Sequence, residues 1–234
     1  MKKNILVIGA SRGIGLELVK HLKEKGHNVF GVSRTRSCEC EWIEGDVSNE
    51  NGIENLIHKV GDLRIDVLIY SAGVWEEKGF ISDFEFRETK DSETRCIMSI
   101  NAVAPIEITK GLAKNLSLSN NPRAIYLGAL SGVDKLASQQ VAYSASKFAL
   151  RGAIQGLRVA LKREGIGFTV INPGNVETDE VLSDIEQGRT KKQVLIPMSD
   201  MVSTIDWLMS LSSSVEVGDV NLIQKAAENS LRPA

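Results

Sequence analysis

The sequence predicts one α/β domain, in which a mostly parallel sheet of about seven strands is flanked by helices in a doubly wound, Rossmann-type arrangement. Short apolar runs with little alternation recur along the 234 residues, as is typical of strands that are buried on both faces. Longer amphipathic stretches separate these runs, and such alternation favours a parallel sheet. No repeat, low-complexity segment or linker interrupts the pattern, so residues 1–234 are interpreted as a single domain.

The apolar runs and the amphipathic stretches define the expected elements. The strands are expected at residues 4–9, 28–33, 41–45, 65–73, 123–129, 167–174 and 219–224. The helices are expected at residues 13–25, 49–60, 91–116, 141–164 and 198–211. The link "RTRSCEC" before the third strand is too short for a helix, so a tight crossover or a loosely paired strand is expected. The polar stretch 179–197 is predicted to be a long loop with one helical turn, either mobile or functional.

Composition and charge exclude several classes of protein. The formal net charge is −2, so no basic surface favours binding to nucleic acid or to an anionic membrane. No apolar run approaches the roughly 18 residues of a membrane span. The start "MKKNILVIGASRGIG" runs directly into a glycine-rich turn without a cleavage pattern, so a cytoplasmic protein is predicted.

The cysteines and histidines do not form a metal-binding pattern. "CEC" lacks a second cysteine pair or a nearby histidine, so free thiols are expected rather than a zinc site. No histidine lies near another candidate catalytic group in the sequence. The residues considered are Cys38, Cys40, Cys96, His21, His27 and His58.

A glycine-rich turn, "GASRGIG" at residues 9–15, directly follows the first expected strand and opens a helix. Glycines allow a tight turn and a close approach of the backbone to a pyrophosphate, and the helix N-terminus supplies free N–H groups. Glycines also end strands for structural reasons, but the strand–turn–helix context makes the signal a strong one. The sequence therefore predicts a dinucleotide-binding turn.

The end of the second strand, "VSRTR", indicates which dinucleotide is bound. NAD-binding proteins usually place an acidic residue here for the ribose hydroxyls. This chain has Ser33 and Arg34 instead, and adds Arg12 within the glycine turn. The arginines are either solvated surface residues or, as two cations beside one ribose site, ligands of a 2′-phosphate; we favour the phosphate, and therefore NADP.

Tyr143 and Lys147 are four residues apart in "AYSASK", within an expected helix. Side chains at this spacing lie on the same helix face. The pair is either a surface cation beside an aromatic ring or a tuned acid, since a nearby positive charge lowers the pKa of a phenol from about 10. In the second case Tyr143 is a candidate general acid or base. On the pair alone we favour the surface cation beside an aromatic ring, and the rest of the chain has to decide.

These motifs, in this order, resemble the short, single-domain branch of the short-chain dehydrogenase/reductase family, in its NADP-preferring type. Further segments that match the family are "GDV" with Asp46 and Val47, "YSAG" at 70–73, "SINAVAP" with Asn101, and "NPGNVET" at 172–178. The resemblance runs from Asn4 to about Gln224 and implies one dinucleotide-binding catalytic domain. It implies these cofactor-binding residues: Gly9, Ser11, Arg12, Gly13, Ile14, Gly15, Ser33, Arg34, Asp46, Val47, Ser71, Ala72, Gly73, Tyr143, Lys147, Pro173, Gly174, Val176 and Thr178.

The resemblance also implies catalytic roles. Tyr143 would donate a proton to a substrate carbonyl as NADPH delivers hydride, or accept one in the reverse oxidation. Lys147 would bind the ribose hydroxyls and lower the pKa of the phenol, together with the oxidised nicotinamide. The main-chain carbonyl of Asn101 would bind a water that links Lys147 to solvent.

The catalytic serine of the family is the main departure from its pattern. Anchoring on Gly132 puts Ala129 at the serine position, whereas counting back thirteen residues from Tyr143 gives Leu130. Ser131 is the nearby hydroxyl and the candidate, although it can equally begin a Ser-Gly turn. Ser138 is a more distant substitute.

The sequence therefore predicts an NADP(H)-dependent oxidoreductase that acts on a small-molecule carbonyl or alcohol. The alternative is a protein that binds NADPH without turnover, as a redox sensor or scaffold, which the doubtful serine favours and the intact tyrosine–lysine pair disfavours. The aromatic residues of 74–90 either line the substrate site or pack as ordinary loop residues. Surplus small and apolar residues on the helices at 91–116 and 141–164 favour a homodimer or homotetramer.

Overall fold

The computed structural model of the chain describes residues 2–36, 40–80 and 84–225. Within this part of the chain, seven strands form a single parallel sheet in the order β3-β2-β1-β4-β5-β6-β7. The order reverses direction between β1 and β4, which is where doubly wound sheets bind their ligands. The strands are β1 (Asn4–Ile8), β2 (Asn28–Ser33), β3 (Glu41–Glu44), β4 (Val67–Tyr70), β5 (Arg123–Leu127), β6 (Gly167–Pro173) and β7 (Asp219–Leu222).

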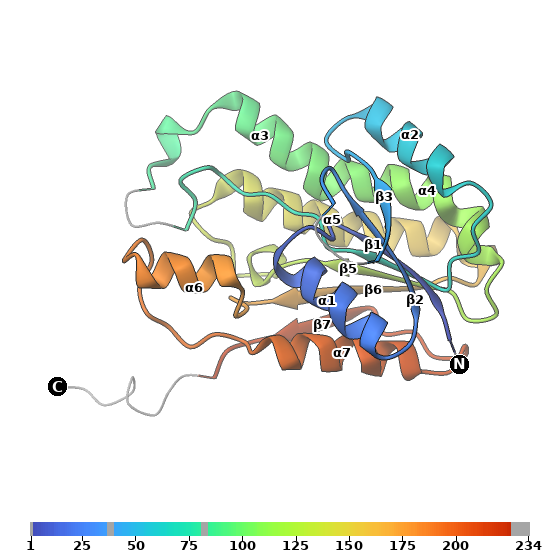
Figure 1. Cartoon of the computed structure of the whole chain (residues 1–234). Coiled ribbons are helices and arrows are strands. Elements are labelled where there is room, and N and C mark those ends of the chain that lie inside the picture. The colour runs from blue at the N-terminus through green and yellow to red at the C-terminus, as the bar shows by residue number, and fades with distance from the viewer. Residues whose placement is uncertain (1, 37–39, 81–83, 226–234) are drawn as a thin grey trace.

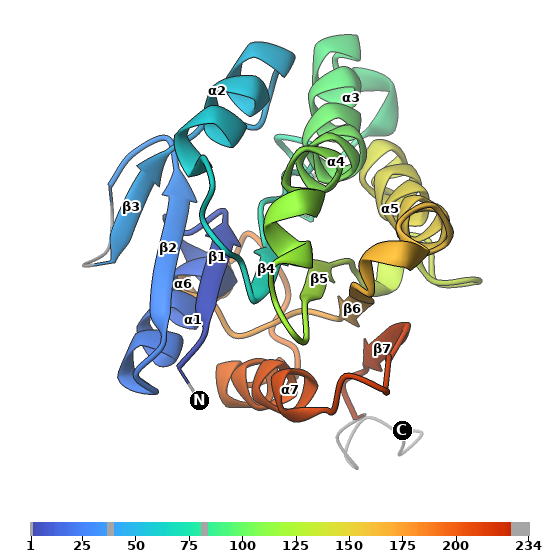
Figure 2. The ribbon, with the colours of Figure 1, turned by 90° about the vertical axis from the view of Figure 1, so that its right-hand side faces the viewer.

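Helices cover both faces of the sheet (Figures 1 and 2). Helices α1 and α7 pack together on one face, whereas α2, α4 and α5 lie on the other, with α3 beside α5. The α-helices of the described residues are α1 (Gly13–Glu24), α2 (Glu50–Val60), α3 (Asp91–Met98), α4 (Ala104–Ser117), α5 (Val141–Ala160), α6 (Asp179–Glu186) and α7 (Met198–Ser210).

The strands contribute to two separate hydrophobic cores. In β1, Leu6 and Ile8 belong to the core beneath α2, α4 and α5, while Ile5 and Val7 belong to the core beneath α1 and α7. All four side chains are fully buried. A strand buried on both faces has no reason to alternate apolar and polar residues, which explains the continuous apolar runs in the sequence.

The predicted fold class is confirmed, and so is the order of strands and helices. The third strand pairs regularly with β2, with Phe30 opposite Glu41 and Ser33 opposite Glu44, so the short link does not prevent parallel pairing. The expected helix at 91–116 is divided by a π-helical segment, Ser99–Val103, which joins α3 to α4.

The prediction for residues 179–197 was wrong in part, because an eight-residue helix, α6, occupies the start of this stretch. The Thr178 side chain accepts a hydrogen bond from the Val181 N–H at 3.4 Å, which caps the helix. Asp179 and Glu180 in the first turn add negative charge at the positive end of the helix. Local capping therefore favours a helix where the polar composition indicates a loop.

The sequence predicts free thiols and histidines without a metal-binding pattern. Cys96 is a free, exposed thiol and Cys40 is buried, and the prediction for Cys38 lies outside the described residues. The His21 ring contacts Asp206 on α7 at 2.9 Å. Among residues 2–36, 40–80 and 84–225, no group of three or more potential metal ligands comes together. In the same ranges, no helix has the length and apolar character that a membrane crossing requires.

Candidate active site

The glycine turn joins the carboxyl ends of β1 and β4. Gly9 has φ of +89°, and a Cβ atom there would lie 2.6 Å from the Ala72 nitrogen. A Cβ on Gly15 would collide with the Gly9 carbonyl oxygen. Both positions therefore require glycine, and the predicted "GASRGIG" and "YSAG" segments are in direct contact.

The start of α1 fits the pyrophosphate of a dinucleotide. Arg12 is the N-cap residue, its side chain makes no capping hydrogen bond, and the first turn has no acidic residue. The free N–H groups and the positive end of the helix therefore favour an anion at this point. The turn around Gly9 and Gly15, which has no room for Cβ atoms, and this helix terminus together fit the predicted cofactor. Ser11, Gly13 and Ile14 lie in the same turn.

Helix α6 lies against this turn. Arg12 Nη1 is 3.1 Å from Glu180 Oε1, and a Cβ on Gly13 would lie 3.4 Å from Glu180 Oε2. Arg12 is largely exposed, so the ion pair is weak, and Glu180 competes with any phosphate for this arginine. The acidic partner of Arg12 is not apparent from the sequence, because the two residues lie far apart in the chain.

The end of β2 presents Ser33 and Arg34 differently. The Ser33 hydroxyl donates to the Thr35 carbonyl at 2.7 Å and accepts from the Trp42 indole at 3.1 Å, so it is already engaged. Arg34 is exposed and has no ion-pair partner within the described ranges. Arg34 is therefore the more available of the two residues for a phosphate.

Asp46 and Val47 follow β3 at the same edge of the sheet. Asp46 Oδ1 accepts from the Ser48 N–H at 2.9 Å, which shapes a turn, and Val47 packs against the larger core. The turn leads into α2, whose N-cap residue Asn49 accepts from the Gly52 N–H. This segment therefore has a local structural role beside the cofactor-binding role that the resemblance implies.

Asn101 connects the loop after β4 to α5. Its side chain is buried in the π-helical segment; Oδ1 accepts from the Val74 N–H at 2.9 Å, and Nδ2 donates to the Val74 carbonyl at 2.7 Å and to Ser146 Oγ at 2.9 Å. A π-helical segment inside a helix is common at functional sites. These three bonds of the side chain fix the loop after β4 to α5, whereas the predicted binding of a water by the main-chain carbonyl stays a prediction.

Tyr143 and Lys147 share one face of α5, as their spacing indicates. Lys147 Nζ lies 5.5 Å from the centroid of the Tyr143 ring, and it donates to the Leu127 carbonyl at 2.9 Å. A Cβ on Gly73 would lie 3.5 Å from this nitrogen and 3.7 Å from Asn101 Oδ1. The end of β4 therefore meets the lysine and the asparagine at one point.

The expected lowering of the Tyr143 pKa by Lys147 is not what the structure shows. Burial raises the pKa of Tyr143, and the neighbouring Glu76 carboxylate raises it further. Burial also lowers the pKa of Lys147 to about 8, so this amine holds its charge less firmly than an exposed lysine. The sequence indicates the cation at the i+4 position, but neither the burial nor the carboxylate.

The predicted serine region follows β5 as a 3-10 turn, Leu130–Gly132, packed against α5. Ser131 makes no side-chain hydrogen bond to the described residues, so its hydroxyl is available, whereas Ala129 is buried. Ser138 is an unsuitable substitute, since its hydroxyl and its N–H both bond to Ser144 Oγ at 3.0 Å.

The segment after β6 begins with Pro173 and Gly174. A Cβ on Gly174 would collide with the side chain of Gln224, which follows β7. Val176 is buried and forms a parallel bridge to Ile196, and Thr178 caps α6. This segment is therefore anchored at several points, which gives its backbone a defined position at the carboxyl edge of the sheet.

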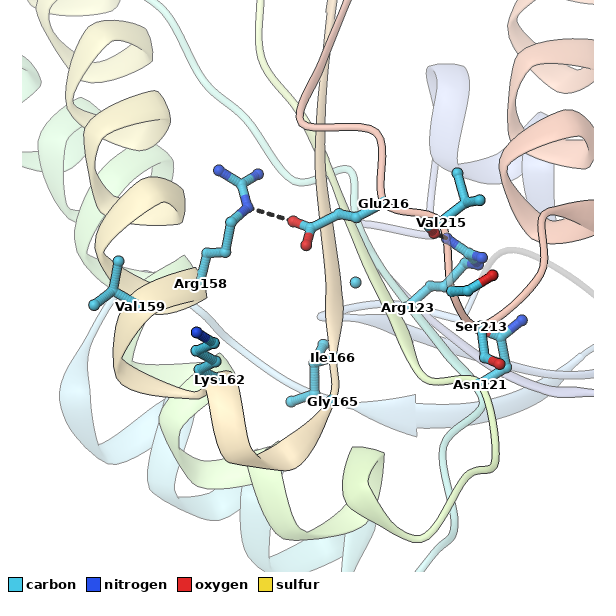
Figure 3. Close-up of a pocket in the computed structure, with 12 residues that line it drawn as sticks. Asn121, Arg123, Arg158, Val159, Lys162, Gly165, Ile166, Ser213, Val215 and Glu216 are labelled. Atoms are coloured by element: carbon cyan, nitrogen blue, oxygen red, sulfur yellow. Dashed lines mark hydrogen bonds and ion pairs between the residues drawn. The ribbon is translucent and has the colours of Figure 1, made fainter.

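A cavity of about 520 Å³ lies outside this region, near the amino ends of β5 and β6 (Figure 3). Arg158 on α5 forms an ion pair with Glu216 across it, and Lys162 lines the same space. No predicted site residue lines this cavity. Its position at the opposite end of the strands separates it from the candidate active site.

Two residues from the loop after β4, Phe80 and Glu76, contact Tyr143. Phe80 packs edge-on against the Tyr143 ring with centroids 5.3 Å apart, and Trp75 packs against Phe80 at 6.0 Å. From the sequence, both aromatic residues were expected either to line the substrate site or to pack as ordinary loop residues. Glu76 was not predicted at all, because one acidic residue in a polar loop carries no pattern.

Comparisons with known proteins identify the family that this chain resembles. The model of the short chain dehydrogenase family matches residues 3–188. The rhamnolipids biosynthesis 3-oxoacyl-acyl-carrier-protein reductase of Pseudomonas aeruginosa is 31% identical over 187 residues, covering 72% of this chain and 71% of that protein. The 3-oxoacyl-acyl-carrier-protein reductase MabA of Mycobacterium avium is 25% identical over 183 residues, covering 76% and 69%. The structure described as ElxO with NADP bound has a TM-score of 0.82 and 21% identity, covering 95% of this chain and 97% of that one.

Proposed function

The chain belongs to the short-chain dehydrogenase/reductase family of oxidoreductases, whose members use nicotinamide cofactors, and we propose that it is an NADP(H)-dependent enzyme acting on a carbonyl or alcohol substrate. The observation that carries the proposal is the meeting of Tyr143, Lys147 and Asn101 beside the glycine cradle. In this proposal residues 1–234 act as one dinucleotide-binding catalytic domain, and a cytoplasmic location stays a prediction.

Each residue of the site has a role in this proposal. The bound nicotinamide supplies or accepts the hydride. Tyr143 donates its phenolic proton to the substrate oxygen during reduction, and takes it back in oxidation. Lys147, anchored to the Leu127 carbonyl, binds the ribose hydroxyls and adds positive charge near the phenol. Asn101 keeps the loop after β4 fixed to α5, and Ser131 donates a hydrogen bond to the substrate oxygen.

The preference for NADP rests on Arg34 and Arg12. Arg34 is exposed at the end of β2 and has no ion-pair partner among the residues that the structure describes, so it can form charge-assisted bonds to a 2′-phosphate. Arg12 can contribute once it leaves Glu180. Structures described as ElxO with NADP bound and as a Pseudomonas aeruginosa RhlG/NADP active-site complex have the same fold, which is consistent with this choice.

The cofactor assignment is tested by titrating NADPH and NADH fluorescence. Wild-type protein is expected to bind NADPH at least about tenfold more tightly than NADH. Arg34→Asp should reverse this order, because it replaces a phosphate-binding cation with a group that suits ribose hydroxyls and repels phosphate. Equal affinity of wild type for both cofactors would refute the assignment.

The substrate class is tested by a carbonyl panel that follows NADPH oxidation. The panel contains 3-oxoacyl thioesters, since the relatives include two 3-oxoacyl-acyl-carrier-protein reductases, together with keto sugars, other ketones and steroids. Tyr143→Phe should bind NADPH normally and lose turnover by about a hundredfold or more, because no other group supplies the proton. Undiminished turnover in this variant would contradict the mechanism. NADPH binding without turnover of any compound would favour the sensor or scaffold instead.

A homodimer or homotetramer built on α4 and α5 is the remaining part of the proposal. Ala149, Ala153, Gly156 and Ala160 form a strip of small residues along α5, and a Cβ placed on Gly156 meets nothing within 4 Å. The nearby Val159 is 77% exposed. Sedimentation at micromolar concentration should give a dimer or tetramer, and a monomer would refute this assembly.

A further inference from the structure

Glu76 is a buried carboxylate next to the proposed proton donor. It lies in the loop after β4 and is only 1% exposed. Oε1 accepts from the N–H groups of Ala142 and Tyr143, at 3.0 and 3.3 Å. The N-cap residue of α5, Gln140, makes no side-chain capping bond. A side chain from a distant loop therefore takes over the capping of the helix that carries Tyr143.

The second oxygen of Glu76 makes this carboxylate unusual. Oε2 is buried and has no hydrogen-bond partner, and Glu76 has no ion-pair partner, among residues 2–36, 40–80 and 84–225. Buried carboxylates are normally paired with a cation or fully hydrogen-bonded. Here the positive end of α5 is the main stabilising element for a negative charge. The charge of Glu76 is therefore incompletely balanced, and the Tyr143 side chain lies within its field.

Other charged groups face this pair from several elements. Glu76 lines a cavity of about 150 Å³, where Lys78 pairs with Glu88 and Lys90 pairs with Glu77. On the other side of the phenol, Lys147 is the facing cation. The 3-10 turn Leu130–Gly132 contributes no titratable group. The remaining charged residues of the cavity are Glu85 and Glu93.

We propose that Glu76 is a positioning residue for Tyr143, which holds the first turn of α5 and keeps the phenol in its protonated, proton-donating form. This inference rests on the proposed function and deepens it, because it concerns the direction in which the site is prepared to act. A neighbouring negative charge disfavours the phenolate, and the pKa of Tyr143 is raised by burial and then by Glu76. Glu76 and Lys147 thus act on the phenol in opposite senses.

The consequence is a pH range suited to reduction. Reduction of a carbonyl requires the phenol, whereas oxidation of an alcohol requires the phenolate as base. By opposing the positive charge of Lys147, Glu76 moves the acid-to-base crossover of Tyr143 to higher pH. The site is then prepared for carbonyl reduction throughout the neutral range.

The test is an NMR titration that needs no substrate. The chain has three tyrosines, so labelling the Cζ carbons with ¹³C gives three signals, and Tyr143→Phe identifies the one of interest. Tyr70 and Tyr126 are fully buried, whereas Tyr143 is half-buried and faces Lys147, so the Tyr143 signal is expected to titrate at the lowest pH of the three. Glu76→Gln keeps an oxygen that can accept from α5 and removes only the charge.

Glu76→Gln is expected to move the ionisation of Tyr143 to lower pH by about one unit relative to wild type. Glu77→Gln is the matched control, because it removes an exposed carboxylate one residue away, and it should leave the curve unchanged. In turnover assays of any substrate found, Glu76→Gln should shift the alkaline limit of reduction down by a similar amount, whereas Glu76→Asp should retain most of the wild-type profile.

Several outcomes overturn the proposal. A Glu76→Gln curve that coincides with wild type across the pH range in which the wild-type Tyr143 signal titrates, or equal shifts in the Glu76 and Glu77 variants, would remove the electrostatic role. Glu76→Met is a second neutral variant, and failure of both neutral variants to fold would assign Glu76 to stability alone. The titration is run with and without NADP⁺, so a protein that binds no cofactor would contradict the proposed function while leaving the comparison of Tyr143 curves intact.

Discussion

A buried cation lies at each end of strand β5, and the two cations differ in how many carbonyl oxygens they bind. At the amino end, the Arg123 guanidinium is 3% exposed and donates to the carbonyls of Leu211, Ser212 and Val215 at 2.8, 2.9 and 3.3 Å. At the carboxyl end, Lys147 is 4% exposed, and within the described residues its amine donates only to the Leu127 carbonyl.

The difference separates a structural cation, Arg123, from Lys147, the cation that we propose to be functional. Three carbonyls tie Arg123 to the segment between α7 and β7, so this arginine holds two parts of the fold together. Lys147 has donors left over, and burial lowers its pKa to about 8, which is a cost to stability near neutral pH. A buried group that lowers stability in this way and has a shifted pKa is a candidate for a functional role.

The largest expected effect comes from removing the cation at the carboxyl end. Lys147→Met should reduce turnover by about a hundredfold or more, because the phenol loses its facing charge. The same change should raise the free energy of unfolding at pH 7 by up to about 3 kcal/mol, because the lysine pKa falls from 10.5 to about 8 on folding.

The sign of this stability effect gives a pH signature. Between pH 8 and 10.5 the unfolded chain retains the lysine proton and the folded chain loses it, so wild-type stability rises with pH in this window. The advantage of Lys147→Met should therefore be full below pH 8 and disappear above pH 10.5. Denaturant unfolding at a series of pH values measures it; a destabilised variant at pH 7 would contradict this account.

Removing the cation at the amino end of β5 is expected to lower, and not raise, the free energy of unfolding. Arg123→Met should lower the free energy of unfolding by about 3 kcal/mol, because three buried carbonyls lose a charged donor. NADPH affinity of the folded protein should not change. Arg158→Met is the control, since this arginine is less buried and should cost about 1 kcal/mol. An Arg123 variant of normal stability and impaired cofactor binding would reverse the assignment of the two ends.

The smallest effect on turnover is expected from changes in the turn directly after β5. Ser131→Ala should reduce turnover by about tenfold, the value of one hydrogen bond to the substrate oxygen, and leave NADPH binding and stability unchanged. Ala129→Ser tests the other assignment of the family serine. A rise in activity in that variant, combined with no effect of Ser131→Ala, would show that Ala129 occupies the catalytic position.

Local sequence patterns predicted the elements well, because the signals are local. Apolar runs mark the strands, and the glycines of the first turn are required by contacts that Gly9 and Gly15 make near themselves and at the end of β4. The spacing of Tyr143 and Lys147 places them on one helix face before any packing is known. The prediction of a loop at 179–197 was wrong in part because two local signals compete there. The polar composition indicates a loop, whereas the Thr178 cap and the acidic first turn favour the helix α6.

The sequence by itself determined the doubly wound fold, the glycine cradle and the tyrosine–lysine face of α5, since each is indicated by a pattern of residues close together in the chain. Tertiary structure alone decided the electrostatics of the site. Burial and Glu76 raise the pKa of Tyr143, Leu127 anchors Lys147, and Glu180 engages Arg12. These effects depend on distances and solvent exclusion between residues far apart in the chain, and no spacing or composition encodes them.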